Sequence, residues 1–242
     1  MTFTVRTLKQ FYQTPLGEVV RIYIEDVVHH FLTPLPHHET ILGLGYVTPF
    51  LPHELHAKNA AMCFTFNQMG CMTWPNAARS TTAIVDAHAL PITNQSVDRI
   101  ILVHALEAAQ HPILCIKELQ RILKPGGQIL IIFPNKNGLW SYSSATPFSY
   151  GQHFTSHELS VLLAEHQFQV VFEKKFLYFP PSQMLHTHSL FAPIEVFGAH
   201  FLPFFSGLNA ICAKKSTLAL PTCTAPQSTF LPLKAIKSYD KT

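Results

Sequence analysis

A glycine-containing stretch near residue 45 is the first place where this sequence could bind a ligand. The residues "ILGLGYVTPFL" (41–51) begin as a short apolar strand in which Gly43 and Gly45 carry no side chain. Bare backbone at the end of a strand lets a ligand approach closely. A nucleotide-binding turn would carry further glycines where this chain has Val47 and Pro49. The stretch therefore predicts either a cofactor-side turn of altered shape or a tight connection without a ligand.

Two polar residues follow later apolar stretches. Asp86 comes directly after "TTAIV" (81–85), and His104 comes directly after "VDRIILV" (97–103). An ionised Asp only accepts hydrogen bonds, which suits recognition of an amino group, although an Asp in this position also commonly caps a turn. His104 either contacts a ligand or is a packed or solvated histidine, and Glu107 lies three residues further on. We leave both alternatives open for each residue.

The elements that position these residues alternate between strands and helices. Helical spacing and capping residues predict helices over 14–32, 111–123, 154–168 and 188–201, and apolar runs predict strands over 41–44, 60–66, 81–85, 97–103, 128–134, 169–179 and 207–215. This order predicts an α/β fold with a doubly wound, mostly parallel seven-stranded sheet and an antiparallel edge strand. We divide the chain into an N-terminal helical extension (1–38), an α/β domain (39–216) and a flexible tail (217–242).

Four pieces in this order resemble the class I S-adenosylmethionine-dependent methyltransferases, in particular the methyltransferase type 11-like group and a little-characterised bacterial branch. They are "TILGLGYVTPFL", "VDAHALPI", "SVDRIILVHALE" and "ELQRILKPGGQILIIFPN". The resemblance implies a Rossmann-like methyltransferase fold and S-adenosylmethionine as cofactor. It also implies that Gly43 and Gly45 line the cofactor. Asp86 would accept a hydrogen bond from the adenine amino group, and the Ala87 N–H would meet the adenine ring. His104 would contact the cofactor or the transferred methyl group.

The sequence departs from the family pattern around the glycine turn. The family has an acidic residue at position 43 and glycine at position 47, and the β-branched Val47 resists the positive φ of the usual turn. Pro49 and Pro52 predict that the next helix begins only near residue 52. The second strand ends in "CFTFNQMG" without the acidic residue that binds the ribose, so Asn67 or Gln68 would have to replace it.

Three functions are compatible with these residues to different degrees. The first is methyl transfer to an unidentified, small-molecule acceptor, with Trp140 and Phe148 either lining an apolar substrate pocket or simply buried in a loop. The alternative is a non-catalytic methyltransferase-like fold that acts as a binding or scaffold protein. A nicotinamide-dependent oxidoreductase is disfavoured, because its motif requires glycine at Thr48.

Composition excludes several other classes of protein. The 242 residues carry a net charge of +3 and only 13% charged residues, so we expect no nucleic-acid partner. No apolar run approaches the ~20 residues of a membrane span, and we expect no membrane partner and no signal peptide.

The five cysteines form no CxxC pair, which favours a reduced, cytoplasmic setting. The fifteen histidines are not at metal-ligand spacing, so we expect no metal; the oligomeric state stays open.

Overall fold

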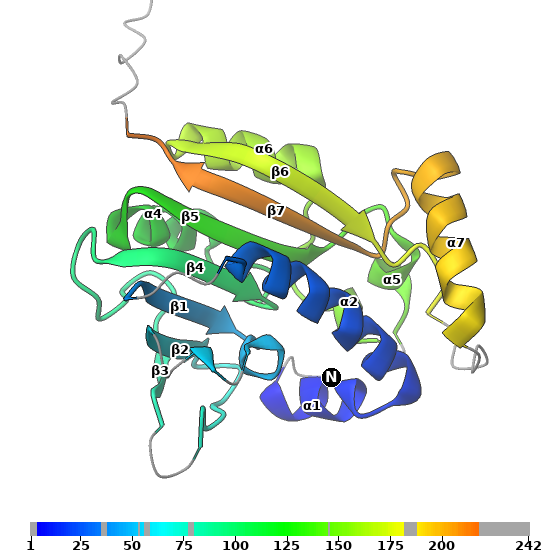
Figure 1. Cartoon of the computed structure of the whole chain (residues 1–242), viewed down its shortest axis with the longest axis horizontal. Coiled ribbons are helices and arrows are strands. Elements are labelled where there is room, and N and C mark those ends of the chain that lie inside the picture. The colour runs from blue at the N-terminus through cyan, green and yellow to red at the C-terminus, as the bar shows by residue number, and fades with distance from the viewer. Residues whose placement is uncertain are drawn as a thin grey trace, which may run out of the picture.

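A computed structural model describes residues 4–34, 38–52, 54–55, 59–76, 80–144, 146–181 and 188–217 of the chain. Its centre is one seven-stranded sheet in the order β3-β2-β1-β4-β5-β7-β6. Neighbouring strands from β3 to β5 pair in parallel, whereas β7 pairs antiparallel with both β5 and β6. The predicted doubly wound, mostly parallel sheet with an antiparallel edge is confirmed (Figure 1).

The strands fall close to the predicted apolar runs. They are β1 (Thr40–Gly45), β2 (Ala60–Phe66), β3 (Thr82–Val85), β4 (Val97–Val103), β5 (Leu123–Pro134), β6 (Phe168–Phe176) and β7 (Leu208–Lys215). The prediction was wrong at the start of β5, where "KPGG" belongs to the strand and does not separate it from the helix. The cause is the pairing of Leu123 with Val97 on β4, a tertiary contact that a local pattern of Pro and Gly does not reveal.

The long helices also match their predictions. They are α2 (Pro15–Leu32), α4 (Pro112–Ile122), α6 (Ser156–Glu165) and α7 (His188–Phe201), and a short α5 spans Leu139–Tyr142. The predicted capping box is present at α6, where the Thr155 side chain accepts from the Glu158 N–H and the Glu158 carboxylate accepts from the Thr155 N–H. The helix α1 (Val5–Tyr12) was not predicted.

The helices cover the sheet on both faces. Helix α2 crosses one face, whereas α4 and α6 lie on the other (Figure 1). The inner residues of α2, such as Val20, Ile24 and Val28, are completely buried and belong to the same apolar core as the strands. Helices α1, α5 and α7 lie near the edge where the parallel strands end (Figure 1). The carboxyl ends of the strands are therefore covered by the first and the later parts of the chain.

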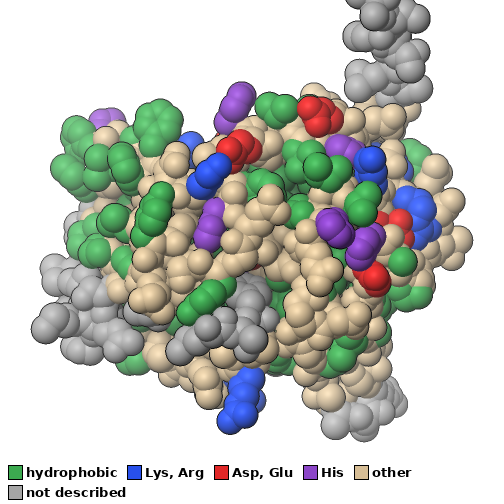
Figure 2. All heavy atoms as spheres, turned by 180° about the vertical axis from the view of Figure 1, so that it is seen from behind, with side chains coloured by type: hydrophobic (Ala, Val, Ile, Leu, Met, Phe, Trp, Pro, Cys, Tyr) green, Lys and Arg blue, Asp and Glu red, His purple; other side chains and the backbone are tan. Residues whose placement is uncertain are grey.

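One flank of the surface is rich in apolar side chains. Phe197 and Phe201 on α7 are more than half exposed, and so are Phe204 and Phe205 in the segment that follows. Figure 2 shows hydrophobic side chains gathered at the upper left, on the side where α7 lies. Among the described helices, none is long and apolar enough to cross a membrane.

Candidate functional site

The turn after β1 is built tightly around its glycines. Gly45 has φ +82°, and a Cβ at this position would lie 2.4 Å from the carbonyl oxygen of Val103 on β4. A Cβ at Gly43 would lie 3.2 Å from both Cys63 Sγ and Val47 Cγ1. The space that the two missing side chains leave is therefore occupied by the chain's own atoms.

The residues after Gly45 take a path that differs from a glycine-rich turn. The Tyr46 N–H donates to the Val103 carbonyl oxygen at 2.7 Å, and Val47 has an ordinary right-handed conformation with φ −88°. A three-residue 3-10 helix, η1 (Thr48–Phe50), follows at once. The helix predicted to begin near Pro52 falls largely on residues 53 and 56–58, outside the described part of the chain.

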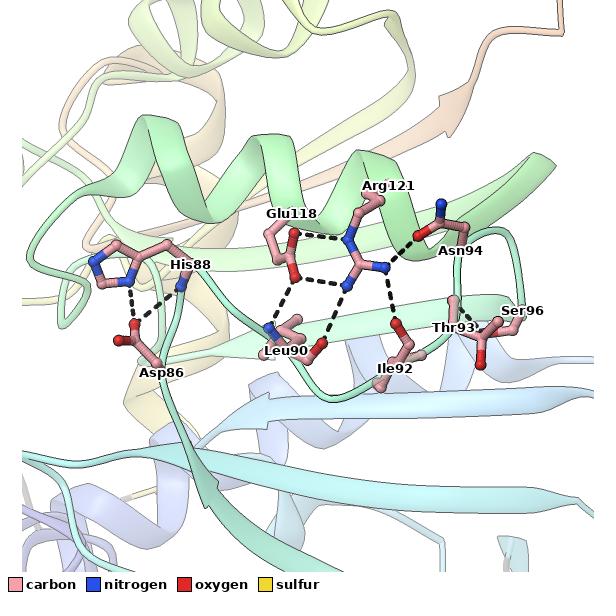
Figure 3. A network of polar contacts seen from close by, with 9 residues as sticks. All are labelled: Asp86, His88, Leu90, Ile92, Thr93, Asn94, Ser96, Glu118 and Arg121. Atoms are coloured by element: carbon pink, nitrogen blue, oxygen red, sulfur yellow. Dashed lines mark hydrogen bonds and ion pairs between the residues drawn. The ribbon is translucent and has the colours of Figure 1, made fainter.

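Asp86 lies at the end of β3, as predicted, and there it caps a turn. One oxygen of its carboxylate accepts from the His88 backbone N–H at 3.2 Å and also contacts the His88 ring (Figure 3). The Asp86 side chain is about half exposed (52%), whereas Ala87 is buried. The turn-capping alternative is therefore present, and the exposed carboxylate remains accessible to a ligand.

Two residues of α4 hold the segment that follows Asp86. Glu118 accepts from the Leu90 N–H at 2.8 Å and from the Arg121 guanidinium, which in turn donates to the carbonyl oxygen of Ile92 at 2.9 Å (Figure 3). The hydrogen bond from Arg121 lowers the pKa of Glu118 below its usual value. The loop between β3 and β4 is therefore fixed to α4 by charge-assisted hydrogen bonds.

The residues proposed to replace the ribose carboxylate have different surroundings. The Gln68 side-chain amide donates to the Ala108 carbonyl oxygen at 2.5 Å, which joins the end of β2 to the loop after β4. Asn67 is exposed and lines a cavity of about 960 Å³ together with Arg6 and Lys9 of α1. Both side chains are exposed, and both border this cavity.

His104 stands at the centre of a buried hydrogen-bonded chain. It follows β4 with the uncommon φ of +55°, and only 2% of it is exposed. Its Nε2 lies 2.7 Å from the Tyr12 hydroxyl, and its Nδ1 lies 3.0 Å from Glu107 Oε1. Burial, with smaller contributions from Tyr46 and Glu107, raises the pKa of Tyr12 well above its ordinary value. The Tyr12 phenol is therefore neutral at physiological pH.

Aromatic rings surround this chain of hydrogen bonds. Tyr12 stacks on Tyr46 with ring centroids 5.5 Å apart and meets Phe50 edge-on at 5.2 Å. Phe148 lies 5.2 Å from the His104 ring and 5.5 Å from Phe11. These six residues (Phe11, Tyr12, Tyr46, Phe50, His104 and Phe148) are all buried, and we call them the aromatic cluster.

The aromatic cluster lies where an α/β sheet of this type binds its ligands. The strand order reverses between β1 and β4, and Tyr46 and His104 follow these two strands directly. Ligands of open α/β sheets bind outside the carboxyl ends of the strands at such a switch point. Gly45 and His104 are therefore brought together at the switch point, whereas Asp86 follows β3, two strands away from β1.

Comparisons with known proteins agree with this geometry. Residues 43–131 match the sequence model of a family described as a methyltransferase domain. A solved S-adenosylmethionine-dependent methyltransferase from Archaeoglobus fulgidus has a TM-score of 0.60 at 15% identity, over 86% of this chain and 97% of that one. Another from Thermotoga maritima has a TM-score of 0.57 at 14% identity, over 88% and 96%. Residues 43–131 therefore resemble a methyltransferase domain, and the chain as a whole shares the fold of these methyltransferases.

The same fold also occurs in a protein of different chemistry. The [4+2]-cyclase SpnF has a TM-score of 0.55 at 17% identity, over 81% of each chain. Likeness at these identities establishes the fold alone, and a fold does not by itself decide a reaction. No curated protein matches the sequence.

A methyl donor bound at the switch point, as ligands of this fold commonly are, would meet the aromatic cluster. Tyr12 and Tyr46 fill the switch point, and the glycine backbone there packs against Val103 and Ala105. One feature nevertheless fits a ligand: Glu107 is 3% exposed, and its Oε2 has no hydrogen-bond partner among the described residues. In this arrangement the site does not fit the donor unless α1 moves.

Sequence reasoning missed α1 and with it Tyr12. The signal was available, because Val5, Leu8 and Phe11 recur at helical spacing after Thr4, whose side chain accepts from the Thr7 N–H at 3.3 Å. Trp140 and Phe148 are both completely buried, as the simpler expectation had it. The Trp140 indole N–H donates to the Phe179 carbonyl oxygen at 2.8 Å, which fixes the loop behind the aromatic cluster.

Proposed function

We propose that the protein is an S-adenosylmethionine-dependent methyltransferase that acts on a small-molecule acceptor, with Gly43, Gly45, Asp86, Ala87 and His104 at the donor site. One observation supports this proposal above the others. The stretch that matches the methyltransferase family, residues 43–131, contains all five residues at the carboxyl ends of three strands of the sheet. It therefore includes the edge of the sheet where ligands of this fold bind.

When bound, the donor supplies a methyl group on a positively charged sulfur, and the protein has to align the acceptor with it. Alignment alone supplies a large part of the acceleration in such transfers. Asp86 has one carboxylate oxygen on His88 and presents the other for an amino group. The Glu118–Arg121 pair holds the following loop, so this oxygen is offered from a fixed position.

The acceptor requires its own space beside the donor. Tyr12 and Tyr46 form one wall of a cavity of about 410 Å³, which Lys9, Glu18 and Arg21 border with charged groups. Small-molecule sites commonly have volumes of ≈ 300–1,000 Å³. Lys9 and Tyr12 belong to α1, so an outward movement of this helix would widen the cavity, and a small polar acceptor would then fit next to the switch point.

Calorimetric titration with S-adenosylmethionine and S-adenosylhomocysteine tests the proposal. We expect both to bind, and we expect Asp86→Asn to weaken binding by about tenfold, because it removes the charge from one hydrogen bond. The matched control is Asp26→Asn, since Asp26 is exposed and pairs only with Lys174 on the surface. A folded protein that releases no heat at several temperatures would contradict the proposal.

The non-catalytic scaffold is the alternative, and it is not favoured. The filled switch point favours the scaffold, whereas the match of residues 43–131 to the methyltransferase family model favours an enzyme. A scaffold would bind neither compound in any variant, so the same titration separates the two.

A further inference from the structure

Helix α1 covers the switch point and places two side chains in it. Its first residue, Val5, donates its N–H to the Met69 carbonyl oxygen at 2.7 Å, which attaches the helix to the loop after β2. Its last residues, Phe11 and Tyr12, enter the aromatic cluster. Access from the α1 side is therefore closed by eight residues of helix.

The hydrogen bonds of His104 determine which group is the donor at each ring nitrogen. In the tautomer that carries its proton on Nδ1, His104 donates to Glu107, and Nε2 is left as an acceptor. Nε2 then accepts from the Tyr12 hydroxyl at 2.7 Å. Tyr12 thus offers His104 the kind of donor group that a ligand could also offer.

Glu107 brings a negative charge into this buried place. One of its oxygens accepts from His104, and the other is buried without a hydrogen-bond partner among the described residues. Buried carboxylates are costly unless they are paired and fully hydrogen-bonded. With α1 in this position, the second carboxylate oxygen of Glu107 can therefore still accept from a positively charged or hydrogen-bond-donating group.

Helix α1 is a short element, and moving it outward exposes apolar side chains that it now buries, among them Leu8 and Phe11. Helices shorter than ∼12–15 residues are marginal on their own, so α1 depends on its contacts with the rest of the fold. Its outer residues Arg6, Lys9 and Gln10 are exposed. The hydrogen bond between Tyr12 and His104 is a buried polar attachment of α1 at the cluster.

We propose that Tyr12 is an internal plug: it occupies the ligand's place at the His104–Glu107 pair, and a cationic ligand enters when α1 moves outward. The proposal rests on the proposed function, because the sulfonium donor with its amino group is the cationic ligand in question. The apparent affinity is then the intrinsic affinity multiplied by the fraction of molecules in which α1 is open.

Two substitutions in the same hydrogen-bonded chain should have opposite effects on the affinity for S-adenosylhomocysteine, measured by calorimetry. Tyr12→Phe keeps the ring but removes the donor to His104, and we expect binding to tighten by about tenfold. Glu107→Gln removes the charge that receives the ligand's amino group, and we expect binding to weaken by about tenfold or more. Tyr142→Phe, at an exposed tyrosine on α5, is the matched control and should change nothing.

Hydrogen exchange supplies a readout that does not depend on affinity. Adding S-adenosylhomocysteine should increase amide exchange in residues 5–12 and should not do so in α4. Binding with unchanged exchange in α1 and no tightening in Tyr12→Phe would overturn the plug and leave the proposed function standing. Absence of binding in the wild type and in Tyr12→Phe, with both folded, would overturn the two proposals together.

Discussion

At the scale of single residues, Gly45 and Gly70 share a left-handed backbone but differ in their surroundings. Both have φ close to +82°, yet a Cβ at Gly70 would meet nothing within 4 Å. A Cβ at Gly45 would meet the Val103 carbonyl oxygen at 2.4 Å and the Ala105 Cβ at 2.9 Å. The turn after β1 therefore requires glycine for packing between β1 and β4, in addition to its backbone conformation.

We expect Gly70→Ala to lower the free energy of unfolding by about 1 kcal/mol, the cost of a left-handed conformation with a Cβ. Gly45→Ala should cost about 2 kcal/mol more, because the backbone around it has to shift. Urea unfolding of both variants measures the difference. Equal losses would show that the turn after β1 opens without strain.

At the scale of elements, α4 is joined to the β3–β4 connection through Glu118 and Arg121. The Arg121 guanidinium donates to both oxygens of Glu118 and to backbone carbonyl oxygens of the connection, and it also contacts the Asn94 side chain (Figure 3). Loops without secondary structure of their own need such anchors to hold a functional residue in place. The anchor acts on the segment that begins at Asp86.

Stability should depend on pH through this anchor. The pKa of Glu118 is lowered in the folded state by the hydrogen bond from Arg121, so its contribution is fully present above the unfolded pKa of about 4.5. It is lost as the pH falls through the lower folded value. At pH 7 we expect Glu118→Gln to cost about 1 kcal/mol, allowing for the partial exposure of Arg121.

Urea unfolding at a series of pH values from 7 to about 3 follows this contribution. The difference between wild type and Glu118→Gln should shrink as the solution becomes more acidic, because a protonated Glu118 resembles Gln. Glu165→Gln, at an exposed glutamate of α6, is the control. A difference that stays constant with pH would contradict the assigned role of the Glu118 charge.

At the scale of the whole molecule, the N-terminal helices and the sheet share one apolar core. The buried face of α2 includes Ile24, Val27 and Val28, each at most 1% exposed, and it crosses the sheet (Figure 1). Arg99 of β4 donates to the Phe31 carbonyl oxygen at the end of α2 at 2.6 Å. The boundary at residue 38 remains a prediction, but the packing argues that residues 5–32 stabilise the α/β domain.

Removing residues 1–38 should therefore abolish cooperative unfolding, since it exposes the apolar face of the sheet that α2 covers. Circular dichroism during urea unfolding measures this. A chain that ends at residue 217, after β7, is the matched control and should unfold cooperatively. A truncated 39–242 chain with a sharp transition would show instead that the N-terminal helices are dispensable.

The sequence predicted most elements because their signals are local. Continuous apolar runs indicated the buried central strands, and Thr155 with Glu158 indicated the start of α6. It also predicted that Val47 would prevent the usual glycine turn, and Val47 indeed has a negative φ. The proposed roles of Gly43, Gly45, Asp86, Ala87 and His104 toward a cofactor stay predictions.

By itself, the sequence determined the order of strands and helices along the chain, the fold class and the resemblance to methyltransferases, because periodicity, capping and motif order depend on residues close together in the chain. Only the tertiary structure decided that Tyr12 meets His104, a contact between residues 92 positions apart. It also decided that the chain's own atoms fill the space around the two glycines after β1, and that Glu107 is buried beside the switch point. Such contacts depend on how α1 docks across the strand ends, and no local pattern of residues encodes that docking.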